Sequence, residues 1–266
     1  MFDTGLLFEH VNQLKKRGRC LSNNFLTIEE MKAYSRRPES MLLCDENAIA
    51  LVCEDLGVMR LYFYLSDLVA ASALKKLMEQ VPQRPVAADC VGRQEQVDAL
   101  SQALCGVGFS VYTQMGRLRA GKTINCPDTS RAGADIYAMP EDTDEILAGL
   151  WETFDPLVSH LPDRELLLSL IKQKLVVRLK NDGKIVAVIC MERVGKQGIY
   201  CYQGYVSPNQ RGKGYGRLIY QIAVDRFRKF YPFTTWVEDS NIQVLKIWNG
   251  FGFQPDDLRN TILIYR

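Results

Sequence analysis

The sequence is poor in residues and patterns that bind metals. Only two histidines, His10 and His160, occur in 266 residues, and neither lies at ligand spacing from a cysteine. The eight cysteines include no C-x-x-C pair, and several lie inside apolar runs, as buried thiols do. We therefore expect no metal site and reduced cysteines, which are typical of a cytoplasmic protein.

Long apolar runs and an excess of one charge are also missing. No apolar run approaches membrane-spanning length, and the first 19 residues have the wrong order of charges for a secretory signal. The 33 basic and 31 acidic side chains give a net charge of +2, too small to attract nucleic acid or an anionic membrane. The basic clusters at 15–19 and 36–37 lack interleaved aromatic residues, so a solvated face explains them better than nucleic-acid binding.

The second half of the chain alternates clearly between strands and helices. Capping residues and apolar positions at helical spacing predict helices over 140–154 and 163–171. Asn181-Asp182-Gly183 is typical of a tight hairpin turn. The remaining expected elements are strands at 135–139, 175–179, 184–191, 199–206, 234–237 and 261–265, and helices from Gly216 and from 239–241. This order indicates a mixed α/β layer.

The first half gives a fainter copy of the same order. Strands are expected at 48–53, 59–65 and 86–90, and helices at 68–78 and 94–104. An internal duplication explains this order, and an unrelated α/β domain is the alternative. We expect two domains, residues 1–125 and 134–266.

A glycine-rich segment, Arg211 to Gly216, separates an apolar strand from an amphipathic helix. The first N–H groups of a helix have no internal partners and the helix dipole is positive there, so an anion binds well. A dinucleotide site would carry an acidic residue about 20 positions further on, but Arg228 and Lys229 lie nearer that position. The predicted ligand is therefore a diphosphate carried on a long chain. In the first half, Asp67 to Ala71 stands at this place without any glycine.

Two segments resemble a known family. Val206 to Leu218 resembles motif A of the GNAT acyltransferases, and Asn241 to Phe253 resembles their motif B. The resemblance implies the α/β (α+β) acyl-CoA N-acyltransferase fold, as two GNAT-like mixed-sheet domains in tandem, of which the first is degenerate and lacks the glycine loop. It further implies acetyl-CoA or another acyl-CoA as co-substrate and the amine of a small molecule or peptide as acceptor. The implied cofactor-binding residues are Tyr205, Val206, Ser207, Arg211, Gly212, Lys213, Gly214, Tyr215, Gly216 and Asn241.

Acyl transfer to an amine requires a neutral amine, a donor to the developing oxyanion and a proton for the thiolate. The resemblance implies that the backbone N–H of Val206 or its neighbour is the oxyanion donor. The family usually takes the proton from a motif B tyrosine, but Trp248 stands at that position, and indole is no useful acid. Tyr205 and Ser240 are nearby candidates for the proton donor, although a packing role is the alternative for such a tyrosine.

Carboxylates at strand ends are the candidates for the base that deprotonates the amine. Glu192 and Glu238 occupy such positions, and solvated strand-end charges are the alternative interpretation. His160 falls between the first two helices of the second half, where the family lines its acceptor pocket. A surface histidine is the alternative there.

Two other functions remain open at this point. Gly116 to Thr123 satisfies the P-loop pattern G-x-x-x-x-G-K-[ST], although the residues that follow are rich in turn formers rather than helical. The replacement of the expected tyrosine by Trp248 also fits a non-catalytic acyl-CoA-binding or regulatory protein. The acceptor, the acyl chain length and the oligomeric state, with a homodimer as one alternative, stay open.

Overall fold

The computed structural model describes residues 2–18, 20–82, 85–121, 124–125, 129 and 134–266. The chain forms two compact units: unit 1 is Met1–Gln114 with Asp257–Arg266, and unit 2 is Met115–Asp256. Two strands, β6 (Phe109–Ala120) and β11 (Phe253–Tyr265), run from one unit to the other. The division therefore differs from the expected domains 1–125 and 134–266, because the last residues of the chain belong to unit 1.

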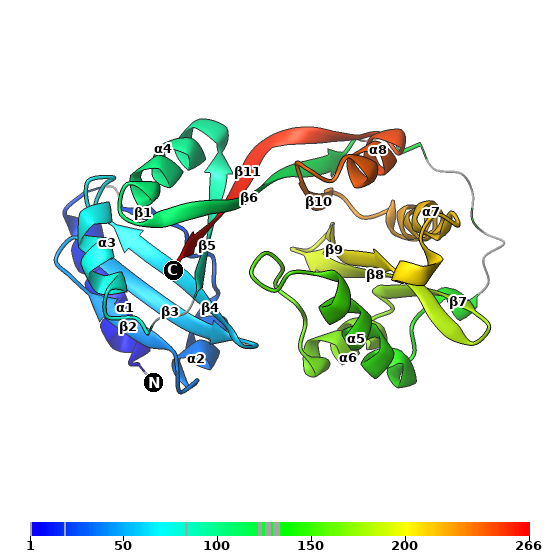
Figure 1. The fold of residues 1–266 in the computed structure, drawn as a ribbon, viewed down its shortest axis with the longest axis horizontal. Helices are drawn as coiled ribbons and strands as arrows, with labels where there is room; N and C mark the ends of the chain where they lie inside the picture. Colours follow the sequence, from blue (N-terminus) through cyan, green and yellow to red (C-terminus); the bar gives the residue numbers. More distant parts are fainter. Residues whose placement is uncertain (1, 19, 83–84, 122–123, 126–128, 130–133) are drawn as a thin grey trace. The chain divides into compact units, whose positions relative to one another are not determined.

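Unit 2 is a mixed sheet with helices on both faces. Its strands lie in the order β6-β10-β9-β8-β7, and only β9 and β10 pair in parallel. Helices α5 and α6 lie on one face of this sheet, and α7 lies on the other (Figure 1). The elements are α5 (Thr143–Thr153), α6 (Arg164–Lys172), β7 (Val176–Asn181), β8 (Lys184–Val194), β9 (Gly198–Val206), α7 (Tyr215–Phe227), β10 (Phe233–Glu238) and α8 (Ile242–Gly250).

Local chemistry explains where several of these elements begin and end. Asp163 caps α6 by accepting the N–H of Leu166 at 2.7 Å, as the sequence predicts. The predicted hairpin between β7 and β8 is confirmed, with positive φ at Asp182 (50°) and Gly183 (76°). The strand expected at 135–139 is wrong: residues 134–136 form a 3-10 turn, and Tyr137 makes a single bridge to β7.

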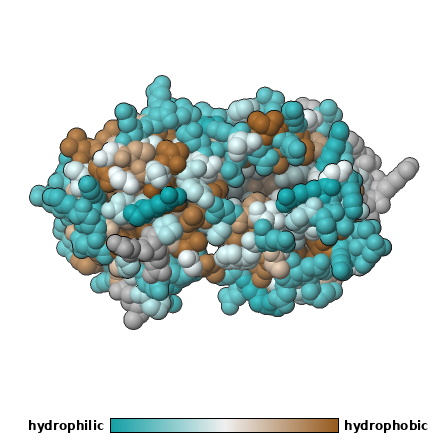
Figure 2. All heavy atoms as spheres, in the orientation of Figure 1, coloured by the Kyte–Doolittle hydropathy of each residue, from teal (hydrophilic) through white to brown (hydrophobic). Residues whose placement is uncertain are grey.

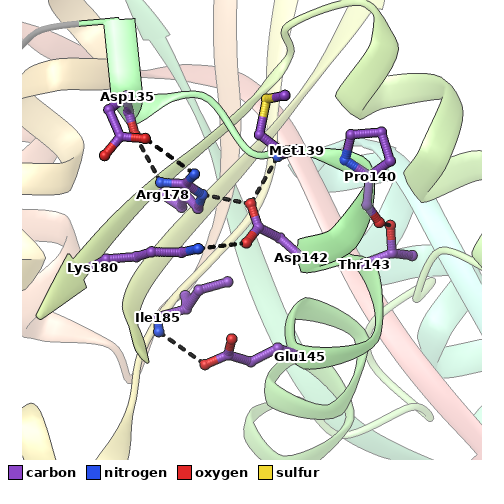
Figure 3. A network of polar contacts seen from close by, with 9 residues as sticks. All are labelled: Asp135, Met139, Pro140, Asp142, Thr143, Glu145, Arg178, Lys180 and Ile185. Carbon is purple, nitrogen blue, oxygen red and sulfur yellow. Dashed lines mark hydrogen bonds and ion pairs between the residues drawn. The ribbon is translucent and has the colours of Figure 1, made fainter. Parts of the chain in front are cut away.

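A buried carboxylate ties the start of α5 to β7 (Figure 3). Asp142, 3% exposed, accepts the Met139 N–H at 2.8 Å and pairs with Arg178 at 2.5 Å and Lys180 at 2.8 Å. Burial alone would raise the pKa of Asp142, but hydrogen bonds from Lys180, Met139 and Arg178 together lower it below its ordinary value. The carboxylate stays charged and holds α5 in place over the sheet.

Unit 1 repeats the order of elements seen in unit 2. Along the chain, α1 to β6 and α5 to β11 both follow the order α-α-β-β-β-α-β-α-β, and the first half adds the two-residue strand β1 between its first two helices. Its sheet has the order β2-β3-β4-β5-β11. The elements are α1 (Thr4–Lys16), β1 (Leu21–Ser22), α2 (Ile28–Ser35), β2 (Met41–Cys44), β3 (Ala48–Asp55), β4 (Val58–Leu65), α3 (Ala71–Met78), β5 (Val86–Arg93) and α4 (Gln94–Cys105).

The described surface and cysteines are unremarkable for a globular protein. On the face shown in Figure 2, hydrophilic side chains predominate and exposed hydrophobic side chains form separate patches. None of the described helices is both long and apolar enough to cross a membrane. Seven cysteines lie in the described part of the chain, and all seven are free thiols.

Candidate active site

Strands β9 and β10 separate after a short region of pairing. Their ladder covers only Ile199 to Cys201 on β9 and Phe233 to Thr235 on β10. Beyond it, β9 continues to Val206 and β10 to Glu238, without pairing to each other. The carboxyl ends of these two parallel strands therefore border a wedge, along which β9 and β10 do not pair with each other.

The backbone of β9 turns one N–H into this wedge. Ser207, the residue after β9, donates its N–H to the carbonyl of Val186 in β8, at 3.0 Å. Successive strand residues direct their N–H groups to opposite sides, so the N–H of Val206 points away from β8 and toward the wedge. At the start of β9, the Ile199 N–H donates to the carbonyl of Pro232, which precedes β10. Odd-numbered residues therefore point their N–H groups away from β8 at this end of β9 and toward β8 at the other end. The register shift opposite Cys190 and Met191 explains this reversal.

The glycine loop lies directly after this strand and opens α7. Gly212 and Gly214 have φ values of 78° and 87°, and a Cβ built on either would meet no atom within 4 Å. The first hydrogen bond of the helix runs from Leu218 N–H to the Gly214 carbonyl, at 3.1 Å. The preceding N–H groups of α7 therefore have no partner within the helix. Open space, free donors and a positive helix end fit a pyrophosphate.

The other residues predicted to bind the cofactor take more varied positions. Arg211 donates from Nε to the Val206 carbonyl at 3.3 Å, and Lys213 donates to the Gln210 side chain at 2.9 Å. Ser207 turns its hydroxyl toward the Ile185 carbonyl. Asn241 uses its side-chain oxygen to cap α8 by accepting the Val244 N–H at 3.2 Å.

Tyr205 lies on the face of the sheet that α5 covers. The side chain is 6% exposed, and a Cβ added at Gly149 of α5 would overlap its phenol. Burial, followed by smaller effects of Cys190, Glu145 and Glu152, raises the pKa of Tyr205. The tyrosine is thus packed into the core beside α5.

Trp248 is a core residue. It is 1% exposed and lies in an aromatic cluster with Tyr220, Phe233, Phe251 and Phe253. Its ring fills the interior between α8 and the sheet rather than presenting an acid.

The predicted carboxylates differ in their relation to the wedge. Glu192 is exposed on β8, and its backbone lies opposite Tyr200 of β9, which precedes the wedge. Glu238 is half-buried and is the last residue of β10, at the open end of the wedge. Ser240 is exposed in the following turn.

The segment between α5 and α6 contacts the bulge of β9. Tyr202 and Gln203 both donate side-chain hydrogen bonds to the His160 carbonyl, the second at 3.0 Å. Gln203 is 6% exposed, and its Oε1 makes no hydrogen bond to any described residue. The backbone of His160, rather than its imidazole, therefore forms this contact.

Tyr220 is the residue at this site that the sequence analysis missed. Its hydroxyl oxygen lies 3.4 Å from the point where a Cβ on Gly204 would stand, and its ring packs edge-on against Trp248 at 5.0 Å. The hydroxyl makes no hydrogen bond to another described residue. Burial, then Cys201, raises the pKa of Tyr220, so the hydroxyl stays protonated at neutral pH. The only sequence signal was its place on α7, four residues after Gly216.

Neither a P-loop nor a metal cluster occurs in the described chain. Gly116 to Ala120 is part of β6, and Gly116 to Arg119 pairs with β10, so these residues form a strand instead of a phosphate-binding loop. Lys122 and Thr123 lie outside the described residues. Over the described residues, no group of three or more His, Cys, Asp or Glu side chains could hold a metal.

Comparisons with known proteins agree with this geometry. Residues 143–253 match the model of the acetyltransferase (GNAT) family. A GCN5-related N-acetyltransferase from Kribbella flavida is similar in structure, with a TM-score of 0.58, 13% identity and coverage of 89% of this chain and 92% of its own. One from Sphaerobacter thermophilus has a TM-score of 0.58 and 16% identity over 90% of this chain and 85% of its own.

A tandem GNAT protein from the clavulanic acid biosynthesis pathway has a TM-score of 0.52 and 12% identity, covering 85% of this chain and 83% of its own. No curated protein sequence matches the chain. The solved structures share the mixed α/β acyl-CoA N-acyltransferase fold, and the family model matches the segment that carries the wedge and the glycine loop. Residues 143–253 therefore match the GNAT family, and the solved structures show its fold over most of the chain.

Proposed function

We propose that unit 2 transfers an acyl group, most simply acetyl, from acyl-CoA to a primary amine by direct attack in a ternary complex. Members of this family use acetyl-CoA or another acyl-CoA as co-substrate. The observation that carries the proposal is the divergence of β9 and β10 directly before an open glycine loop. The wedge offers strand-edge hydrogen bonds to an extended pantetheine arm, and the loop offers N–H donors to its pyrophosphate.

The backbone and Tyr220 supply the groups that act on the thioester. The N–H of Val206 would stabilise the oxyanion as the amine nitrogen bonds to the acyl carbon. Tyr220 would give its hydroxyl proton to the thiolate as the carbon–sulfur bond breaks, and regain one from water. Its position beside Gly204 supports this role more than the packed position of Tyr205 does.

The acceptor amine would approach from the side of the α5–α6 segment. Gln203 Oε1 is a buried acceptor that could bind an amine N–H there. Glu238 is the carboxylate that we favour as the base, since it ends β10 at the open end of the wedge. A small-molecule or peptide amine is the proposed acceptor class, and the free thiols are in keeping with the cytoplasm.

We also propose that the chain is a tandem GNAT protein. The matching order of elements in the two units supports it, as does the structural similarity to a protein described as a tandem GNAT. In this proposal unit 1 is the degenerate copy without a glycine loop.

Amine-dependent release of free CoA from acetyl-CoA tests the proposed reaction, across a panel of small primary amines and peptides. Gly214→Glu places a carboxylate in the anion site, so we expect kcat/KM to fall at least about 100-fold, or about 2.7 kcal/mol. Gly57→Glu is the matched control, because Gly57 has a φ of 86° and the same open surroundings in unit 1.

Equal loss of activity in both variants would assign the effect to backbone strain and contradict the proposal. Binding of acetyl-CoA by the wild type without release of CoA, for any amine in the panel, would favour the second candidate function, a non-catalytic acyl-CoA-binding protein. The core position of Trp248 is the observation in favour of that alternative.

A further inference from the structure

Unit 1 contains a wedge like that of unit 2. Its parallel strands β4 and β5 pair only at Met59–Val86 and Arg60–Ala87. After these residues the two strands separate, while the other edge of β4 stays paired with β3 along its whole length. The separation begins at the point in the fold that corresponds to the divergence of β9 and β10.

In unit 1 the chain itself fills the wedge. Strand β1, between α1 and α2, pairs antiparallel with β4 through Leu21–Leu65 and Ser22–Tyr64. Because β3 occupies the other edge of β4, β1 lies on the edge that faces β5. The hydroxyl of Ser22 adds a hydrogen bond to the Phe63 carbonyl at 2.8 Å.

Asn23 joins the two separated strands. Its Nδ2 donates to the Leu61 carbonyl of β4 and to the Asp89 carbonyl of β5, both at 3.0 Å. Its Oδ1 accepts the Phe63 N–H at 2.7 Å. The side chain is 4% exposed, so one buried amide satisfies the strand-edge groups that an extended ligand would otherwise bind.

A carboxylate of the chain also lies at the start of α3, the helix that follows β4. Asp67 accepts the Ala70 N–H at 3.0 Å, immediately before α3 (Ala71–Met78). The next N–H groups, of Ala71 and Ser72, donate to the turn carbonyls of Leu68 and Val69. The start of α3 therefore offers few donors to a phosphate, and the Asp67 carboxylate repels a second anion.

We propose that unit 1 is a cofactor cleft closed by its own chain, in which Leu21–Asn23 replaces the pantetheine arm and Asp67 replaces the pyrophosphate. The protein then binds one acyl-CoA per chain, in unit 2. This inference rests on the proposed function for the identity of the ligand, and on unit 1 alone for the closure.

Calorimetric titration with CoA measures the number of sites. We expect about one equivalent for the wild type and for Asp67→Asn, and none for Gly214→Glu. Two equivalents in the wild type, with one retained in Gly214→Glu, would overturn the closure and leave the proposed function intact. Zero equivalents in the wild type would overturn the proposed function instead.

Hydrogen exchange tests the closure without any ligand. The Phe63 amide should be protected in the wild type, because it donates to a buried side chain. Asn23→Ala should speed its exchange at least about tenfold, while amides in β9 keep their rates. Asn23→Asp serves as a second variant, since it retains an acceptor for this amide. Rapid exchange of Phe63 in the wild type would show that the segment is not seated in the wedge, and would overturn the inference.

Discussion

Tyr220 is the residue on which the proposed chemistry depends most. A departing thiolate needs a proton source within hydrogen-bonding reach, and the usual position in motif B holds a tryptophan that is 1% exposed. Tyr220 packs against this tryptophan and brings its hydroxyl beside Gly204 on β9. An α7 side chain therefore brings a hydroxyl to β9, whereas the α8 side chain stays in the core.

Tyr220→Phe should lower kcat about 100-fold and leave KM for acetyl-CoA within about threefold, because only the proton transfer is removed. Tyr205→Phe is the comparison, with the same atom deleted from a phenol packed against α5, and we expect it to keep most of the activity. Steady-state kinetics at saturating amine measure both. Loss of kcat in Tyr205→Phe with normal kcat in Tyr220→Phe would reverse the assignment.

The sequence predicted the backbone geometry of the proposed site better than it predicted the side chains. Gly212, Gly214 and the strand before them were predicted, because backbone donors at a helix start need glycine and leave a local pattern. Tyr220 and Gln203 leave no such pattern, because each proposed role depends on neighbours that the fold brings close, such as Gly204 and the His160 carbonyl.

At the scale of elements, α5 sits close to the sheet because it has a glycine where Tyr205 packs. Gly149 faces this phenol, and Asp142 anchors the start of the helix to β7. The same close approach holds the α5–α6 segment against the bulge of β9, where the His160 carbonyl accepts hydrogen bonds. The wall on the proposed acceptor side therefore depends on the packing of α5.

Gly149→Ala should lower the free energy of unfolding by about 1–3 kcal/mol, since the added methyl group overlaps the Tyr205 ring in a packed core. Gly250→Ala in α8 is the control: a Cβ there meets no atom within 4 Å. It should raise the free energy of unfolding by about 0.5–1 kcal/mol, through helix propensity. Urea denaturation measures both. A neutral Gly149→Ala would contradict the packing described for α5.

Element prediction succeeded over most of the second half of the chain and failed at the start of the first half. The hairpin at 181–183 and the Asp163 cap were predicted, since turn and cap residues act locally. The helix α2 was not predicted, because it buries only Met31, and β1 is two residues long. The helix α1 was not predicted either, although it buries Leu7, Val11 and Leu14 at helical spacing. The contacts of β1 with β4 lie about 40 positions away in sequence, beyond any local pattern.

At the scale of the whole molecule, the chain repeats one order of elements, but the wedges of the two units differ in what occupies them. In unit 2 the wedge is bordered by the part of β9 that does not pair with β10 and by an open glycine loop. In unit 1 the corresponding wedge holds β1 and Asn23. The missing glycines at 67–71 indicated from the sequence that the two units differ. Only the structure shows that Asp257–Arg266, with the greater part of β11, belongs to unit 1.

The central claim is that backbone amides of unit 2 hold an acyl-CoA. Amide NMR spectra of the labelled protein, recorded with and without acetyl-CoA, test it most directly. The account predicts the largest shifts at Val206 and at Gly212 to Arg217, with residues 61–71 of unit 1 unchanged. Unchanged amides from Gly212 to Arg217 at saturating acetyl-CoA, or shifts centred on residues 61–71, would contradict it.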